Sequence, residues 1–110
     1  MASAAYGFAA GLNGTPPVAA QLMPRAFDTG SISPTQVVNA TTSEQTFTVT
    51  GLTTSDAVIV NKPTHQAGLG IVNARVSAAD TLAITFMNAT AATITPTASE
   101  TYKVIAFRVA

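Results

Sequence analysis

From Gln36 to Ala110 the sequence repeats one pattern, in which short runs of alternating apolar and polar residues are separated by turn residues. Alternation with a period of two is the pattern of a β-strand that has one buried face. The run Gln45–Thr50 shows it most clearly, with Phe47 and Val49 on one side and threonines on the other. No clear helical pattern interrupts these runs, so we expect this part of the chain to fold as sheet.

Short strands at regular spacing, joined by turns, are typical of an antiparallel sandwich. We therefore predict an all-β fold, an antiparallel β-sandwich, jelly-roll-like, of about seven or eight short strands in a domain of residues 33–110. One run, Ala57–Asn61, is apolar on both faces and is predicted to be a central strand. The other expected strands are 35–40, 45–50, 71–76, 81–87, 93–95 and 101–109.

Residues 1–32 have no sustained period and consist mainly of Ala, Gly and Pro with single scattered aromatic residues. A segment of this kind has no core of its own and is expected to fray when alone in water. We predict an irregular N-terminal arm over 1–32 that attaches to a neighbouring subunit or a larger body. Its expected anchor residues for that partner are Tyr6, Phe8, Leu12, Leu22, Met23, Arg25 and Phe27.

The chain carries few charges, and this limits its partners. Charged residues make up 9% of the sequence, with a formal net charge of zero, against about 25% in an average soluble domain. The five basic residues are scattered, whereas nucleic acids and anionic membranes require clusters of them. We expect neither nucleic acid nor membrane as a partner. The chain contains no cysteine, which fits assembly in a reducing compartment such as a cytoplasm.

The residues that could support catalysis do not form a recognisable motif. The single histidine, His65, lies in an expected loop, where a surface role is far more common than that of a general base. The carboxylates lie at expected turns or strand ends, and we expect Asp56 and Asp80 to stabilise turns by hydrogen bonds to the backbone. We predict that the protein is not an enzyme, with no catalytic residues, no cofactor and no metal site. The carboxylates considered are Asp28, Glu44, Asp56, Asp80 and Glu100.

Two sets of residues are candidates for contacts between subunits. Arg75 is expected to share a strand face with Ile71 and Asn73. It is either an edge residue that reaches solvent or half of an inter-subunit ion pair with Asp80, Glu100 or a partner's carboxylate. The outer face of the last strand is apolar and needs a cover, which the arm or a second subunit could supply. The residues of that face are Ile105, Phe107 and Val109.

Four stretches between Glu44 and Arg108 together form a recognisable pattern of strands and turns: Gln45–Leu52, Asp56–Pro63, Gly68–Phe86 and Ile94–Val104. With these stretches, the segment from Glu44 to Arg108 resembles small virion proteins of tailed bacteriophages. The pattern is similar to the β-sandwich module of capsid decoration (cement) proteins and of knob or fibre domains on phage particles.

The resemblance implies a structural protein on the outside of a phage head, assembled in the host cytoplasm. Its partners would be the major capsid protein and further copies of itself, in a homotrimer at local threefold sites. The alternative it leaves open is a receptor- or glycan-binding module of a tail or head fibre. In that case the loops 53–56, 64–70 and 88–92 would bind the ligand.

Overall fold

The computed structural model describes residues 24–108, and these form an all-β fold of six strands. Within this range no helix occurs that is long and apolar enough to cross a membrane. The strands are β1 (Arg25–Ile32), β2 (Thr41–Thr48), β3 (Ala57–Asn61), β4 (Leu69–Ala78), β5 (Thr81–Asn88) and β6 (Glu100–Phe107).

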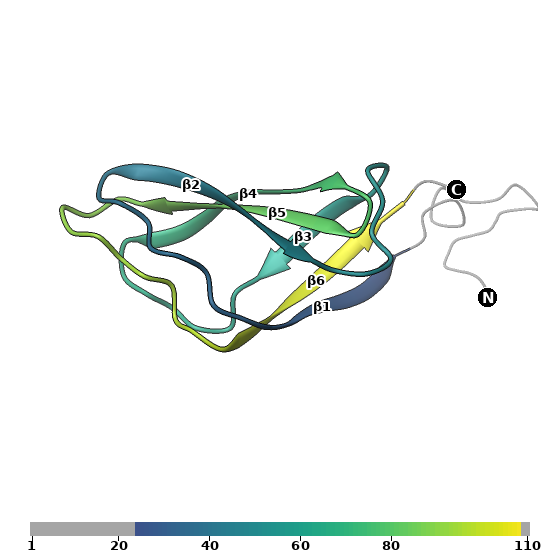
Figure 1. Ribbon diagram of the computed structural model, residues 1–110, viewed down its shortest axis with the longest axis horizontal. Coiled ribbons are helices and arrows are strands. Elements are labelled where there is room, and N and C mark those ends of the chain that lie inside the picture. Colours follow the sequence, from purple (N-terminus) through teal and green to yellow (C-terminus); the bar gives the residue numbers. More distant parts are fainter. Residues whose placement is uncertain (1–23, 109–110) are drawn as a thin grey trace, which may run out of the picture.

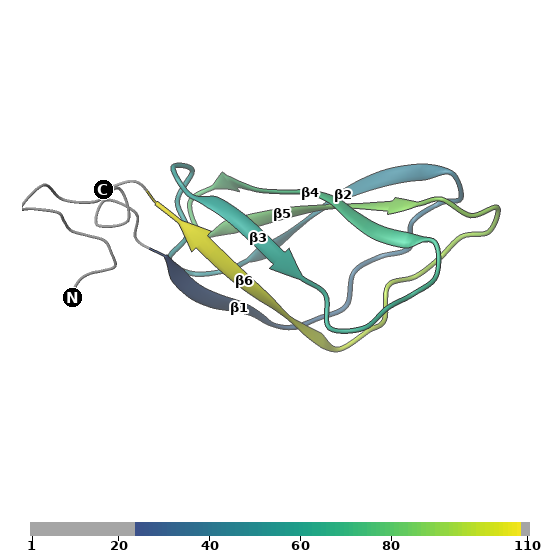
Figure 2. The same cartoon turned by 180° about the vertical axis from the view of Figure 1, so that it is seen from behind.

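The strands form two antiparallel three-stranded sheets that pack face to face as a small β-sandwich (Figure 1). One sheet has the order β1-β6-β3 and the other β2-β5-β4, so that β6 and β5 are the central strands. The view from behind shows the first sheet in front of the second (Figure 2). Only β4 and β5 are joined by a tight hairpin, and the other connections pass between the sheets.

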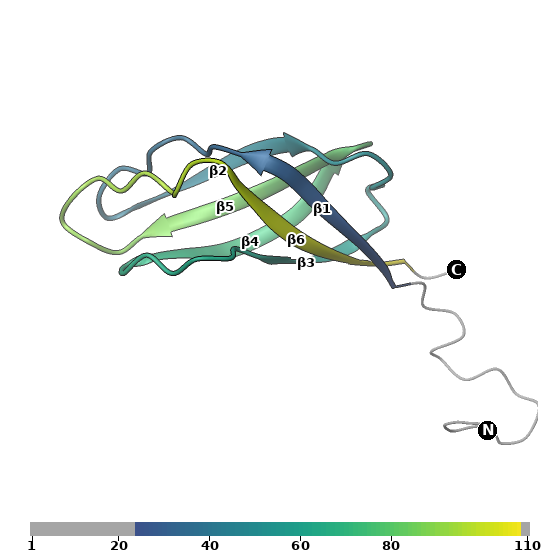
Figure 3. The ribbon, with the colours of Figure 1, turned by 90° about the horizontal axis from the view of Figure 1, so that it is seen from below.

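The two ends of the sandwich differ in what they carry (Figures 1 and 3). At one end, here called the terminal end, β1 begins and β6 ends, beside the connection 49–56 and the β4–β5 turn. At the other, here called the loop end, the connections 33–40, 62–68 and 89–99 lie together. The chain therefore enters and leaves the domain on the same side.

The core consists of the inward-facing residues of both sheets, as the alternation predicts. Leu82, Ile84 and Phe86 of β5 are fully buried, and Tyr102 and Val104 of β6 lie opposite them. The rings of Phe86 and Tyr102 meet edge to face, with centroids 6.4 Å apart and planes at 76°. The predicted sandwich is confirmed, because the residues expected to point inward are the ones that form its core.

Residues 24–108 form six strands, not the seven or eight that the sequence predicts. The expected strands 35–40 and 93–95 are only a single antiparallel bridge between Val37 and Ile94. These two residues exchange backbone hydrogen bonds of 2.8 and 3.1 Å. Pro34 and Pro96 flank the bridge, and a proline has no N–H to extend a ladder. The two sheets have three strands each within this range, and their total of six is smaller than the eight strands of a jelly roll.

The sequence predicts an arm that extends to Ile32, but residues 25–32 form β1 and belong to the sandwich. Strand β1 pairs with β6 from Arg25 opposite Ala106 to Ile32 opposite Glu100. Its period is hidden by a register shift between Asp28 and Ser31, where Gly30 adopts a positive φ of 65°. The sequence there resembles a loop, whereas it is a β-bulge in an edge strand.

Strand β3 was expected in the centre of a sheet and lies at an edge. Its residues alternate between half-buried and exposed, with Val58 and Val60 turned inward and Ile59 turned outward. The apolar character of both faces therefore does not reflect burial on both sides. It leaves a large aliphatic side chain on the outer surface of the sheet.

Candidate functional site

The outer surface of the β1-β6-β3 sheet carries an apolar strip at its terminal end. Ile59 and Ile105 are directly opposite each other on β3 and β6, and their exposed fractions are 61% and 38%. On the other side of Ile105 lies Ala26 of β1, and the pair Phe107–Ala57 continues the strip. We call this strip the β6 face; its residues are Ala26, Ala57, Ile59, Ile105 and Phe107.

The β6 face ends abruptly at the next row of the sheet. There Asp28 of β1 is opposite Lys103 of β6, and Lys103 is opposite Asn61 of β3. The apolar strip is thus bordered by one polar row with both signs of charge. This arrangement resembles the apolar centre and polar rim of a protein contact surface.

The outer surface of the β2-β5-β4 sheet is different, since threonines and one ion pair dominate it. Arg75 of β4 reaches across β5 to Glu44 of β2, with Nε 2.8 Å from Oε2 and Nη2 3.1 Å from Oε1. The hydrogen bond lowers the pKa of Glu44 and raises that of Arg75. Val72 and Met87 are exposed on this sheet.

Arg75 shares its face with Asn73, as expected, and its side chain is 57% exposed on the edge strand β4. It does not share that face with Ile71, because β4 contains a bulge. A register shift between Ile71 and Asn73 inserts Val72, so Ile71 packs toward the core while Arg75 faces outward. Its partner Glu44 belongs to the same chain and was not among the carboxylates proposed for it.

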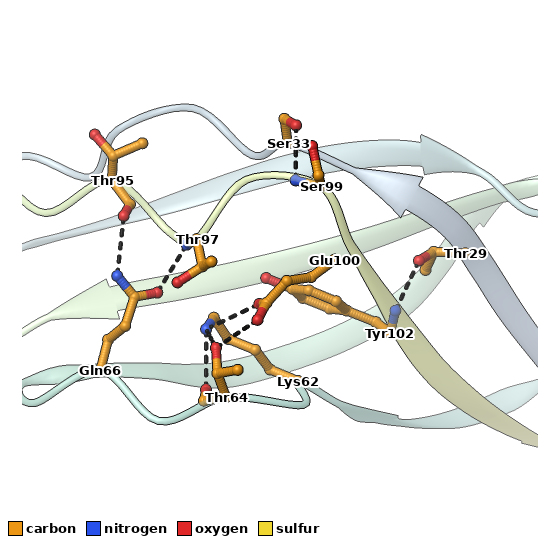
Figure 4. A network of polar contacts seen from close by, with 10 residues as sticks. All are labelled: Thr29, Ser33, Lys62, Thr64, Gln66, Thr95, Thr97, Ser99, Glu100 and Tyr102. Atoms are coloured by element: carbon orange, nitrogen blue, oxygen red, sulfur yellow. Dashed lines mark hydrogen bonds and ion pairs between the residues drawn. The ribbon is translucent and has the colours of Figure 1, made fainter.

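The loop end holds a buried ion pair, which Figure 4 shows from close by. Lys62 Nζ lies 3.3 Å from Glu100 Oε1, and the two side chains are only 11% and 10% exposed. Lys62 also donates to the carbonyl and hydroxyl oxygens of Thr64, each at 2.9 Å. The Thr64 hydroxyl donates in turn to Glu100 Oε2 at 2.6 Å. Together these contacts anchor the start of β6 to the connection that follows β3.

Two buried oxygen atoms beside this ion pair have no hydrogen-bond partner within residues 24–108: Glu100 Oε1 and the hydroxyl of Tyr102. Glu100 Oε1 is within ion-pair distance of Lys62 without the geometry of a hydrogen bond. Burial and the nearby Glu100 raise the pKa of Tyr102 to about 12. The hydroxyl is therefore neutral over the physiological range.

Side-chain amides fasten the connections at the loop end to one another. The amide of Gln66 donates to the Thr95 carbonyl and accepts from the Thr97 N–H (Figure 4). The amide of Gln45 forms the same pair of bonds with the backbone of Thr35. Each glutamine replaces one rung of a β-ladder, so these connections are held without further strands.

A buried asparagine and a glycine complete the loop end. Asn88 donates to the carbonyls of Val37 and Ala92, and its oxygen accepts from the N–H and the hydroxyl of Thr90. Gly68, at a φ of 82°, lies directly against the methyl group of Thr90.

The terminal end is closed by a second ion pair. Arg108 donates to both carboxylate oxygens of Asp56, at 2.6 and 2.8 Å, and to the carbonyl of Gly51. The Asp56 side chain is 1% exposed. The Arg108 hydrogen bonds, opposed by burial and aided by the Thr53 N–H, lower the pKa of Asp56 to about 2, and they raise that of Arg108.

Several sequence predictions can be compared with this geometry. Asp56 and Asp80 do stabilise turns, since they accept from the backbone N–H groups of Thr53 and Gly51. His65 lies exposed in the connection after β3. No group of three or more histidine, cysteine or acidic side chains that could hold a metal ion occurs within 24–108. The sequence reasoning missed both buried ion pairs, although Lys62 and Glu100 each border a strand.

The expected anchor residues fall into two groups. Phe27 packs against the core from β1, and the Arg25 guanidinium lies over its ring at 5.4 Å from the centroid. Phe27 is thus part of the sandwich rather than of a separate arm. The remaining expected anchors, and Val109 from the expected strand 101–109, lie outside the described residues; these are Tyr6, Phe8, Leu12, Leu22, Met23 and Val109.

The loops expected to act together in ligand binding do not all meet. The connections 64–70 and 88–92 adjoin at the loop end, where the Ala89 N–H donates to the Gly68 carbonyl at 2.8 Å. The connection 53–56 lies at the opposite end (Figure 1). No pocket is found within residues 24–108. Neither the family models, nor the curated proteins, nor the solved structures contain a match to this chain.

Proposed function

We propose that this chain is a structural protein of a phage particle, a head decoration or cement protein that binds the outside of the capsid. The observation that carries the proposal is the β6 face, where Ile59 and Ile105 lie side by side and exposed. Isolated exposed aliphatic side chains are ordinary. Here two of them are adjacent on paired strands and bordered by a polar row, which supports a role as the apolar centre of a larger contact surface. The resemblance of residues 44–108 to phage virion modules is the reason for proposing a phage particle as the larger assembly.

In this proposal the protein acts by adding contact area to the capsid lattice. Copies associate through their β6 faces as a homotrimer at local threefold sites, and the major capsid protein is the second partner. With strands about 4.8 Å apart, the strip covers roughly 200 Å², against about 800 Å² per partner in an ordinary stable interface. The β6 face is therefore the apolar centre of a larger contact whose rim includes Asp28 and Lys103.

The copy number and position of the protein in purified particles test this proposal. We expect hundreds of copies on the head, located by mass spectrometry and electron microscopy. The double variant Ile59→Ser/Ile105→Ser should lose incorporation. The matched variant Val72→Ser/Met87→Ser, which removes exposed aliphatic groups from the other sheet, should keep it. A few copies confined to the tail, or normal incorporation of the first variant, would contradict the proposal.

A receptor- or glycan-binding module is a second candidate, favoured by the organised loop end. The adjoining connections 64–70 and 88–92 are held by backbone and side-chain hydrogen bonds, which lowers the entropic cost of binding. In this case the isolated protein should bind host cells, and a His65→Ala/Thr64→Val variant should bind less. Absence of binding by the unchanged protein in a pull-down with host cells would remove this candidate.

A further inference from the structure

The free edge of β2 differs from the other three sheet edges. Strand β4 has two register shifts, β1 has one, and β3 is only five residues long and runs into Lys62-Pro63. Bulges, short length and proline are the devices by which proteins protect edges from pairing. Strand β2 has none of them: it pairs with β5 in unbroken register over all eight residues.

The direction of the unpaired backbone groups on β2 follows from one hydrogen bond. The Val49 N–H, just beyond β2, donates to the Asp80 carbonyl at 2.9 Å. Because backbone groups alternate in direction along a strand, the odd-numbered residues of β2 point toward β5. The N–H and carbonyl groups of the even-numbered residues then point to the free edge, and all four residues are exposed. These residues are Thr42, Glu44, Thr46 and Thr48.

We propose that this edge pairs with β2 of a second copy of the chain, antiparallel and about a twofold axis. The two three-stranded sheets would then form one six-stranded sheet. The register that uses every free group places Thr42 opposite Thr48 of the second copy and Glu44 opposite Thr46. It supplies eight backbone hydrogen bonds, two for each of four facing pairs.

The side chains of the edge favour a second copy over a charged partner strand. Glu44 is the single charged residue of β2, and Arg75 of the same chain already neutralises it. The register shifted by one pair would place Glu44 opposite Glu44, which is destabilising in a sheet. The proposed register avoids this, because it places Thr42 opposite Thr48 and Glu44 opposite Thr46. A twofold contact of a surface with itself is also the commonest symmetry of protein oligomers.

The chain has no cysteine, so disulfide trapping can test the register directly. Thr42→Cys and Thr48→Cys proteins are mixed at high concentration and oxidised. In the proposed register their Cα atoms are about 5.5 Å apart, within the range of about 4.4–6.8 Å that a disulfide spans. Thr42→Cys mixed with Thr85→Cys is the control, since Thr85 lies one strand inside the edge on the same outer surface.

We expect a disulfide-linked heterodimer in the 42/48 mixture, at least tenfold more than in either protein alone or in the control mixture. A Thr46→Pro substitution in both proteins should remove it, because the ring blocks the free edge while the β5 ladder keeps its bonds. Equal trapping in all mixtures, or none in the 42/48 mixture, would overturn the proposal. The inference does not depend on the β6 face, so Ile59→Ser/Ile105→Ser should trap as the unchanged pair does.

Discussion

Replacing Gly68 by alanine tests how tightly the connections at the loop end are packed. A Cβ at this position would lie 2.1 Å from the Thr90 methyl carbon, far inside van der Waals contact. The methyl group cannot turn away cheaply, because the Thr90 hydroxyl is held by Asn88 at 2.7 Å and by the Ala92 carbonyl at 2.8 Å. The backbone φ of 82° adds strain for any residue with a side chain.

The expected loss in the free energy of unfolding is the sum of these two effects. Strain at positive φ costs about 1 kcal/mol, and forced overpacking costs roughly 1–3 kcal/mol. We therefore expect Gly68→Ala to lose about 3 kcal/mol. This corresponds to a fall of roughly 10–20 °C in the melting temperature of a domain of this size. Urea unfolding followed by circular dichroism measures it.

Two control variants separate strain from steric clash. Gly30 also has a positive φ, of 65°, but a Cβ there would meet nothing within 4 Å, so Gly30→Ala should lose only about 1 kcal/mol. Thr90→Ser removes the clashing methyl and keeps the hydroxyl, so Gly68→Ala/Thr90→Ser should recover about half of the loss. Equal losses for Gly68→Ala and Gly30→Ala, or no recovery in the double variant, would show that the Thr90 methyl group does not clash with a side chain at position 68.

Three further predictions concern the buried polar groups. Asp56→Asn should lower the free energy of unfolding by about 2 kcal/mol at neutral pH, because it weakens the charged hydrogen bonds to Arg108. The pKa of Asp56 in the folded state is about 2, below its ordinary 3.8, so its stabilising contribution is full above about pH 4 and is lost toward pH 2. The variant should therefore show a flatter acid unfolding curve. Tyr102→Phe should leave the free energy of unfolding unchanged or raise it by about 1 kcal/mol, because the hydroxyl is buried without a partner within residues 24–108. Because burial raises the pKa of Tyr102 in the folded state to about 12, the unchanged protein should lose stability from about pH 10 upward, and the variant should not. Lys62→Met should lower the free energy of unfolding by about 3 kcal/mol, because it leaves Glu100 buried and unpaired, whereas Lys62→Met/Glu100→Leu should recover most of this loss. Equal stability of the single and double variants in urea unfolding would contradict a buried ion pair.

The alternation of the sequence predicts the fold class and most of the core, because burial of one strand face acts residue by residue. Phe47, Val49 and the inward residues of β5 and β6 are therefore correctly assigned. The same rule fails where a bulge changes the phase. The bulge at Gly30 conceals β1, and the bulge at Val72 places Ile71 on the face opposite to Arg75 instead of on the same one.

The position of a strand within its sheet cannot be predicted from local pattern, since it depends on pairing between distant segments. β3 is apolar on both faces yet lies at an edge, and this leaves Ile59 exposed beside Ile105. The outward apolar residues of the last strand are visible in the sequence. Their partner on β3 becomes apparent only when the register between β3 and β6 is known.

The ion pairs at the two ends of the sandwich are a second kind of feature that sequence reasoning could not find. Lys62 and Glu100 are far apart in the chain, as are Asp56 and Arg108. Each pair forms because antiparallel neighbours bring strand ends together. The low charge content of the sequence is a signal that could have pointed to these ion pairs, because a charged residue next to a strand in such a chain is expected to have a partner.

Assembly through the β6 face is tested by the association state of the chain with and without the two isoleucines of that face. Sedimentation equilibrium at micromolar concentration is run in a Thr46→Pro background, which blocks pairing through the β2 edge. It should give a trimer for the protein with an unchanged β6 face and a monomer for Ile59→Ser/Ile105→Ser. The free energy of unfolding of the variant subunit should stay within about 1 kcal/mol of that of the subunit with an unchanged β6 face, because both side chains are exposed in the single subunit. A protein with an unchanged β6 face that stays monomeric, or a variant that still forms trimers, would show that this face does not mediate assembly.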